Sequence, residues 1–160
     1  MILLKYTDFL DKIFKKINEY GIDVFKFEMD HLAYTASSKE EYEKLKTEFT
    51  KLGELKSENL VGGRRVGVYK LFKKLPYKNF LISALELLEP ENGKKVFSGL
   101  EHAEFVIDTG FEEFINKYPN LPWNTSHIKR AEFPRLKLDL GNGLEIKFHL
   151  DSILNHSALS

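Results

Sequence analysis

The first twenty residues carry apolar side chains at the spacing of a helix. Leu4, Phe9, Ile13 and Ile17 recur at intervals of four or five residues, with lysine and aspartate between them. This pattern predicts an amphipathic helix that packs one stripe against the rest of the fold. Gly21 is placed to end the helix, because glycine adopts the left-handed backbone of a helix C-cap without steric cost.

The next part of the chain alternates between strand-like and helix-like patterns. DHLAYTA has strand propensity, and SSKEEYEKLKTEFTKLG predicts a helix capped by Ser37 or Ser38. In ELKSENLVGGRRVGVYKLF, Gly62–Gly63 forms a turn between two extended pieces, and KNFLISALELLEP adds a strand after a break at 74–76. The first half therefore reads as a strand, a helix and three strands.

The second half repeats this order. LEHAEFVID predicts a strand, and FEEFINKYP predicts a short helix that ends before Pro119. RLKLDLGNGLEIKFHL predicts a hairpin about Asn142–Gly143, since that dipeptide favours a tight turn with positive φ.

Residue matches between the halves support an internal duplication. Both halves open on a strand with an acid–histidine pair, whose histidines, His31 and His102, are 71 residues apart. Both close on a strand with a potential ligand, and these residues, Glu86 and His149, are 63 residues apart. We interpret the pattern as a repeat of about 60–70 residues that builds one continuous sheet.

The period of two in a strand predicts which side chains share a face. In the strand LISALELL, it puts Leu81 on the helix side with Leu85 and Leu87, and Ile82 on the polar side with Glu86. Four strands offer an imidazole or a carboxylate on the face away from the helices: His31, Glu86, His102, Glu104, Glu145 and His149.

Imidazole and carboxylate groups together form a ligand set for Zn, Fe, Ni or Mn. The chain has no cysteine, which favours an open catalytic site over a closed structural zinc site. Half-buried structural histidines are the alternative interpretation.

Arg64 and Arg65 follow the glycine pair, where a guanidinium can bind a substrate carboxylate or phosphate. The alternative is that the turn is simply an exposed basic one.

Composition narrows the classes of partner. The chain has 160 residues, and 24 Lys+Arg balance 24 Asp+Glu, so no net charge attracts nucleic acid or an anionic membrane. No stretch approaches the ~20 apolar residues of a membrane span, although the lysines of the first segment leave a membrane-surface helix as an alternative. The lack of cysteine fits a reducing cytoplasm, where we expect the protein.

The segments DHLAYTA, SENLVGGRRVGVYKL, LELLEP, GLEHAEFVI and IKFHLDSI together resemble the YecM-like family of the vicinal oxygen chelate superfamily. This resemblance spans nearly the whole chain. It implies a divalent metal held by the opening-strand residues His31 and His102 and by the closing-strand residue Glu86. For the fourth ligand, the repeat selects His149, whereas the superfamily's closing-strand carboxylate favours Glu145.

The resemblance also implies an α+β fold in which two βαβββ modules form a curved mixed sheet around a cleft, with the N-terminal helix packed on the outside. We expect one domain over 1–160. Its expected parts are the N-terminal helix, the first module, the second module and a tail: 1–22, 23–92, 93–153 and 154–160.

Members of this superfamily include isomerases, lyases, dioxygenases, epimerases and antibiotic-binding proteins, so the fold does not choose a reaction. We expect a metal-dependent isomerase, lyase or oxygenase, with Zn, Ni, Fe or Mn, whose small substrate chelates through two adjacent oxygens. Glu104 and Glu145 are the candidates for proton transfer, and Arg64 is the candidate clamp for a substrate anion. A non-catalytic module that sequesters a small molecule in the same cleft is the alternative, and a monomer and a homodimer both fit.

Overall fold

The computed structural model describes residues 5–92 and 94–156, so Leu4 lies outside the described residues. The described chain forms four helices and eight strands: α1 (Tyr6–Tyr20), β1 (Glu28–Thr35), α2 (Lys39–Leu52), β2 (Gly53–Val61), β3 (Arg64–Tyr77), β4 (Phe80–Leu88), β5 (Gly99–Val106), α3 (Phe111–Lys117), β6 (Trp123–Asn124), β7 (Leu136–Gly141), β8 (Leu144–His149) and α4 (Ile153–His156). Among these helices, none has the length and apolar character needed to cross a bilayer.

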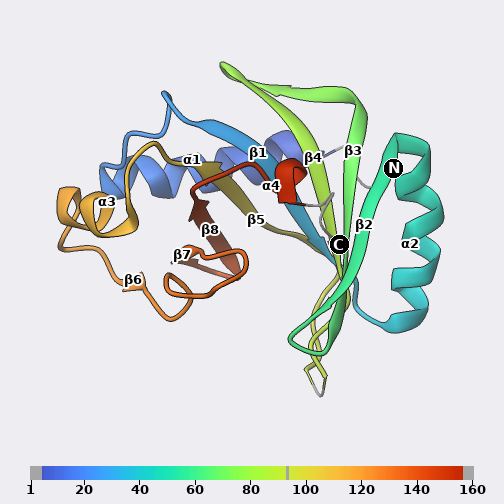
Figure 1. The fold of residues 1–160 in the computed structure, drawn as a ribbon. Helices are drawn as coiled ribbons and strands as arrows, with labels where there is room; N and C mark the ends of the chain where they lie inside the picture. Colours follow the sequence, from blue (N-terminus) through green and yellow to red (C-terminus); the bar gives the residue numbers. More distant parts are fainter. Residues whose placement is uncertain (1–4, 93, 157–160) are drawn as a thin grey trace.

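One curved sheet runs through the molecule, in the strand order β2-β3-β4-β1-β5-β8-β7-β6 (Figure 1). In each half, the opening strand pairs in parallel with the closing strand, β1 with β4 and β5 with β8. The two opening strands, β1 and β5, pair with each other in antiparallel orientation and join the halves. The expected α+β fold of two βαβββ units is confirmed.

Helix α1 packs on the outside of the sheet, as its pattern predicts. Gly21 ends it with a φ of 71°, and its buried stripe is Phe9, Leu10, Ile13, Phe14 and Ile17. Of the two predicted capping serines, Ser38 is the N-cap of α2. Ser38 Oγ accepts the Glu41 N–H at 3.0 Å, while Glu41 Oε1 accepts the Ser37 N–H at 2.9 Å.

The two faces of the central strands differ in chemistry. The face toward the helices forms the apolar core, to which β5 contributes Phe105 and β8 contributes Ile146 and Phe148. The alternate residues of these strands, Glu104 and His149, are buried on the opposite face. The predicted assignment of faces is confirmed for β5 and β8.

Strand β3 corrects one predicted boundary. It continues through 74–76, and the turn to β4 lies at Lys78, whose φ is 51°. Pairing of β2 with β3 stops at Leu71, so the later part of β3 has a neighbour on one side only. Pro76 lacks an N–H group, and a position without a second neighbour strand tolerates that loss.

Strand β4 corrects the predicted phase of its first residues. Leu81 is 61% exposed, whereas Ile82 is buried in the core together with Leu85. The β3–β4 register is interrupted between the pairs Lys70–Ala84 and Leu75–Ile82. Such a bulge adds local twist to the strand, and the twist brings both Ile82 and Leu85 to the core side.

The assignment of Ile82 to the core and Leu81 to the surface can be tested by measuring the stability of variants. Ile82→Ala is expected to lower the free energy of unfolding by about 2–5 kcal/mol, because it leaves a cavity in the core. Leu81→Ala is the matched control and is expected to change it by less than about 0.5 kcal/mol. Urea unfolding followed by circular dichroism measures both, and the opposite ranking would contradict the observed phase.

Candidate metal centre and adjoining cavity

Two histidines from the opening strands point into one buried centre. His31 on β1 and His102 on β5 are both fully buried. The Nδ1 atom of His31 lies 3.1 Å from Asp30 Oδ2, and that of His102 lies 3.2 Å from Glu101 Oε1. A carboxylate in this position draws the ring proton to Nδ1 and leaves the Nε2 lone pair free. Neither Nε2 atom has a hydrogen-bond partner among the described residues.

The pKa values of these two rings shift in opposite directions. Burial lowers the pKa of His102, and the charge of Lys147 lowers it further. Burial also acts to lower the pKa of His31, but the carboxylates of Asp30 and Glu104 outweigh that effect and raise it. His102 is therefore the ring more strongly held in the neutral form that binds metals.

Two buried carboxylates face the free nitrogens. Glu104 Oε1 lies 3.6 Å from His31 Nε2 and 3.7 Å from His102 Nε2. Glu86 Oε1 lies 3.7 Å from His102 Nε2, and ligand atoms of His31, Glu86 and His102 all lie within 4.8 Å of one another. Two atoms bound tetrahedrally to one Zn²⁺ at about 2.1 Å are roughly 3.4 Å apart, so this spacing is near that of a metal centre.

Arg135 neutralises the two carboxylates, although no sequence pattern singled it out. Its Nε atom lies 3.1 Å from Glu104 Oε2, and its Nη2 atom lies 3.9 Å from Glu86 Oε2. Burial alone would raise the pKa of both glutamates, but Arg135 and the nearby histidines lower both. Arg135 sits in the loop before β7, where its N–H donates to the carbonyl of His127, so only the tertiary fold brings it to the centre.

His149 lies beside the centre with both ring nitrogens occupied. Its Nε2 atom is 2.9 Å from Asp30 Oδ1, and its Nδ1 atom is 2.7 Å from Glu104 Oε2. Burial would lower the pKa of His149, but Glu104 and Asp30 raise it to about 10. In this charged form both nitrogens donate to carboxylates, and no lone pair is left for a metal.

The register of the sheet shows how the repeat relates the closing strands. In the β1–β4 pair, Glu86 lies opposite the residue two positions after His31. In the β5–β8 pair, Lys147 lies opposite the residue two positions after His102. Lys147 therefore corresponds to Glu86, and His149 lies two residues further along β8.

Glu145 is more exposed than the residues of the centre. Its side chain is 28% exposed, and its Oε1 atom lies 3.7 Å from Lys147 Nζ. It can group with Glu101 and His102 as a second potential ligand set. The structure thus brings together His31, Glu86, His102 and Glu104, with His149 beside them, and leaves Glu145 at the edge.

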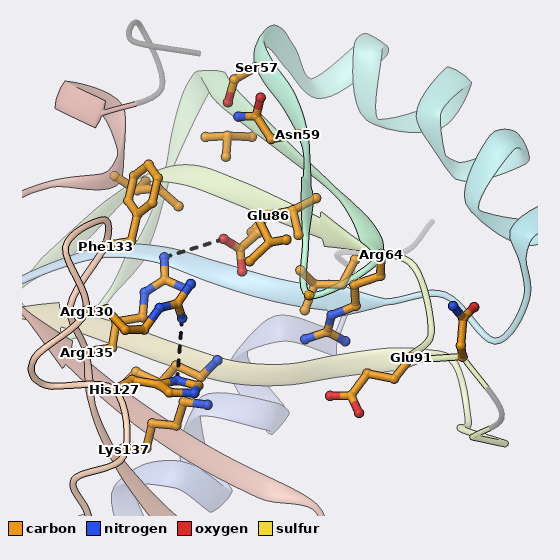
Figure 2. A pocket seen from close by; sticks show the side chains of 18 residues that line it. Ser57, Asn59, Arg64, Glu86, Glu91, His127, Arg130, Phe133, Arg135 and Lys137 are labelled. Carbon is orange, nitrogen blue, oxygen red and sulfur yellow. Dashed lines mark hydrogen bonds and ion pairs between the residues drawn. The ribbon is translucent and has the colours of Figure 1, made fainter.

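A cavity of about 440 Å³ opens next to the centre (Figure 2). Glu86, Arg135 and Lys147 line it, so it reaches the residues that surround the metal centre. Strands β2 and β3 form one wall, and the loop before β7 contributes His127.

The two adjacent arginines at the start of β3 have different surroundings. Arg64 lines the cavity and donates from Nη1 to the Glu89 carbonyl at 3.3 Å. Arg65 instead pairs with the carboxylates of Glu43 and Glu89 and lies over the Tyr42 ring, 4.4 Å from its centroid. The position expected to clamp a substrate anion, Arg64, therefore faces the cavity.

Solved structures of other proteins share this fold. A variant of Streptomyces coelicolor methylmalonyl-CoA epimerase, a vicinal oxygen chelate protein in complex with 2-nitronate-propionyl-CoA, matches with a TM-score of 0.54 and 13% identity. The match covers 76% of this chain and 94% of the epimerase. The chain has the vicinal oxygen chelate fold, whose members are often metal-dependent enzymes.

The chain belongs to the YecM protein family, whose family model matches residues 1–155. The structural genomics protein EC4020 matches with a TM-score of 0.82 and 23% identity, over 99% of this chain and 91% of that one. An uncharacterized protein of Haemophilus influenzae is 32% identical over 109 residues, and Escherichia coli protein YecM is 26% identical over 105 residues. These matches cover 68% and 66% of this chain but only 57% and 54% of the two relatives, so the matching region is a little over half of their length.

The ion pair between Arg65 and Glu89 generates a pH-dependent prediction. Hydrogen bonds from the Arg65 side chain lower the pKa of Glu89 below its ordinary value of 4.5. Because the folded-state pKa is depressed, the pair stabilises the fold above that ordinary value, and the contribution is lost as the pH falls below it. Glu89→Gln is therefore expected to cost about 1–3 kcal/mol at pH 7.

The same substitution should cost progressively less below the ordinary pKa, because the wild-type carboxylate is then protonated as well. Urea unfolding of both proteins at a series of pH values measures the difference. A cost that stays constant across the series would contradict the ion pair as its source. Glu43→Gln removes the exposed partner of Arg65 and serves as the weaker control, with an expected cost below about 1 kcal/mol.

Proposed function

We propose that the chain binds a divalent metal ion, Zn, Ni, Fe or Mn, through His31, His102, Glu86 and Glu104. On this proposal it is a vicinal oxygen chelate enzyme, an isomerase, lyase or oxygenase, whose small substrate chelates through two adjacent oxygens. The observation that carries the proposal is the pair of buried Nε2 atoms, which lack hydrogen-bond partners and face two carboxylates.

The donor set fits a metal on energetic grounds. A buried polar atom left without a partner costs about 1–3 kcal/mol, and the Nε2 atoms of His31 and His102 are both in that state. Asp30 and Glu101 hold the opposite sides of the two rings, in the way that outer carboxylates orient metal-bound histidines. A bound cation would satisfy both free nitrogens at once.

The proposed fourth ligand is Glu104, in place of the His149 that the sequence repeat selects. Glu104 Oε1 faces both free nitrogens, whereas both nitrogens of His149 face carboxylates. We assign His149 the role of holding Glu104 in position. Glu145, which lies beside Lys147, does not line the cavity and is the weaker candidate both as ligand and as proton acceptor.

A bound divalent metal would supply Lewis-acid activation of the substrate oxygens. The residues of the chain would orient the substrate and handle the proton. Glu104 is the candidate proton acceptor, and the charged His149, whose Nδ1 atom lies 2.7 Å from Glu104 Oε2, holds it in position. Arg64 in the cavity wall would bind an anionic part of the substrate.

Sequestration without turnover is the second candidate function. Both Arg135 and His149 pair with Glu104, and these two cations weaken it as a base. A sequestering protein would return its ligand unchanged, whereas an enzyme would convert it. Analysis of the ligand after incubation with metal-loaded protein separates the two functions.

Elemental analysis is the first test of the metal proposal. Protein purified without a metal-binding tag and equilibrated with Zn, Ni, Fe or Mn is expected to retain about one metal ion per chain, and to melt at a higher temperature in its presence. His31→Gln/His102→Gln should lose the metal. His127→Gln changes a cavity histidine outside the centre and should retain it. Folded wild type that retains no metal under any of these conditions would overturn the proposal.

Chelator competition tests the identity of the fourth ligand. Glu104→Gln is expected to weaken metal binding by more than about 100-fold, because it removes a ligand. His149→Gln should weaken it by about 10–100-fold, as expected for a residue that orients a ligand. Glu145→Gln should leave the affinity unchanged. A larger loss in His149→Gln than in Glu104→Gln would place His149 in the ligand set instead.

A further inference from the structure

The cavity next to the metal centre is strongly basic, although the chain as a whole has no net charge. Its acidic lining residues are Glu86 and Glu91. Its basic lining residues are Arg64, His127, Arg130, Arg135, Lys137 and Lys147. The excess of positive charge is thus a local property of this cavity.

Three of the arginines and lysines in the lining have no ion pair with a carboxylate among the described residues. Arg135 pairs with glutamates of the centre, and Lys147 lies 3.7 Å from Glu145. Within the described ranges, by contrast, no ion pair involves Arg64, Arg130 or Lys137. Each of these three cations therefore keeps donors available for a ligand in the cavity.

Glu91 offsets the charge of Arg64 only in part, because Lys94 contributes more than Arg64 to lowering the pKa of Glu91. It lines the cavity near Arg64, as Figure 2 shows, but its carboxylate pairs with Lys94 at 2.5 Å. Glu86, the other acidic residue of the lining, faces His102 and Arg135. Both carboxylates of the lining are thus already engaged with other groups.

The unpaired cations come from two opposite walls. Arg64 begins β3 in the first half of the chain, and Arg130 belongs to the loop before β7 in the second half. In Figure 2, their side chains extend into the cavity from opposite sides, with Lys137 on the same side as Arg130. Arg130 Nη1 contacts the His127 ring at 3.5 Å, which helps to hold the guanidinium along its wall.

The titration of the lining agrees with a field of positive charge. Burial lowers the pKa of His127, and Lys137, Arg130, Lys147 and Arg135 all lower it further. Burial and Lys147 likewise lower the pKa of Lys137. Like charges held close together repel one another, and a bound anion relieves that repulsion.

We infer that the cavity binds its substrate through an anionic oxyacid group, a carboxylate or a phosphate, held between Arg64 on one wall and Arg130 and Lys137 on the other. This inference about the class of substrate rests on the proposed function. It adds that the substrate, whose adjacent oxygens would bind the metal, also carries an acidic group. Guanidinium groups suit this ligand because their paired N–H donors match the oxygens of carboxylates and phosphates.

The remaining lining defines the rest of the ligand. The lining also includes apolar side chains from three strands and from the loop before β7: Val61, Val66, Val68, Leu88 and Phe133. A ligand that fits this lining combines an anionic group with an apolar portion. This distribution is typical of small-molecule sites, where apolar walls carry a few directed polar groups.

The test uses inorganic phosphate and malonate as separate probes, titrated calorimetrically into metal-free, chelator-treated protein at low ionic strength. Wild type is expected to bind at least one of them, and added salt should weaken the binding. Arg130→Gln/Lys137→Gln should weaken it by roughly tenfold or more, since each lost cation removes charge-assisted hydrogen bonds. Arg64→Gln, which changes the opposite wall, should do the same.

The charge-matched control is Lys73→Gln/Lys129→Gln, which removes two exposed cations outside the cavity and should leave binding unchanged. Thermal melting shows whether each variant is folded. If Arg130→Gln/Lys137→Gln is not folded, the binding measured for Arg64→Gln decides the test. A preference for malonate or for phosphate distinguishes a carboxylic acid from a phosphorylated substrate. Absence of binding by wild type, or equal binding by wild type and cavity variants, overturns the inference.

Metal-free protein keeps this test separate from the metal proposal. If elemental analysis finds no metal while the anion still binds through Arg64, Arg130 and Lys137, the proposed enzyme fails and the acid-binding cavity stands. If metal binds at His31 and His102 but no anion binds, the metal proposal stands and the acid-binding inference fails.

Discussion

The carboxylate of Asp30 is fully buried where β1, β8 and α4 meet, and it accepts three hydrogen bonds there. The donors are His31 Nδ1 at 3.1 Å, His149 Nε2 at 2.9 Å and the Ile153 N–H at 2.8 Å. Burial would raise the pKa of Asp30, but the two histidines lower it to about 2. This one anion orients the His31 ring, keeps His149 charged beside Glu104, and fixes the segment that places Ile153 in the cavity wall.

The arrangement of charge around that anion explains how a neutral chain carries two regions of opposite character. The candidate metal centre concentrates carboxylates on the inner strands, and the cavity beyond it concentrates cations. Arg135 stands at the boundary, paired with Glu86 and Glu104 while it lines the cavity. Burial of charge is costly unless each group has a partner, and most of the inner groups do. The exceptions are the free Nε2 atoms and the unpaired outer cations, and these support the two binding proposals.

The duplication gives the two halves the same topology, but the functional residues are not symmetric. The position that corresponds to Glu86 in the second half is Lys147, which lies in the cavity lining and lowers the pKa of His102. A carboxylate from the opening strand, Glu104, faces the centre instead.

The sequence determined the main elements, their order and most faces of the strands, because these depend on local spacing, but it did not predict β6 or α4. The period of two placed His102 and Glu104 opposite Phe105, and Gly21, Ser38 and Gly143 mark ends and turns by their own backbone and side-chain chemistry. Where the prediction was wrong, at 74–76 and at Leu81–Ile82, pairing with a neighbouring strand overrode the local pattern.

Only the tertiary structure decided which polar groups meet. Strand register gives Lys147, and not His149, the position in the second half that corresponds to Glu86 in the first half. The loop before β7, which has no recognisable motif, places Arg135 beside Glu86 and Glu104 and places Arg130 in the cavity lining. Contacts of this kind join residues far apart in the chain, and no local period records them. The sequence could therefore indicate a shared polar face, while the partners on that face followed from packing.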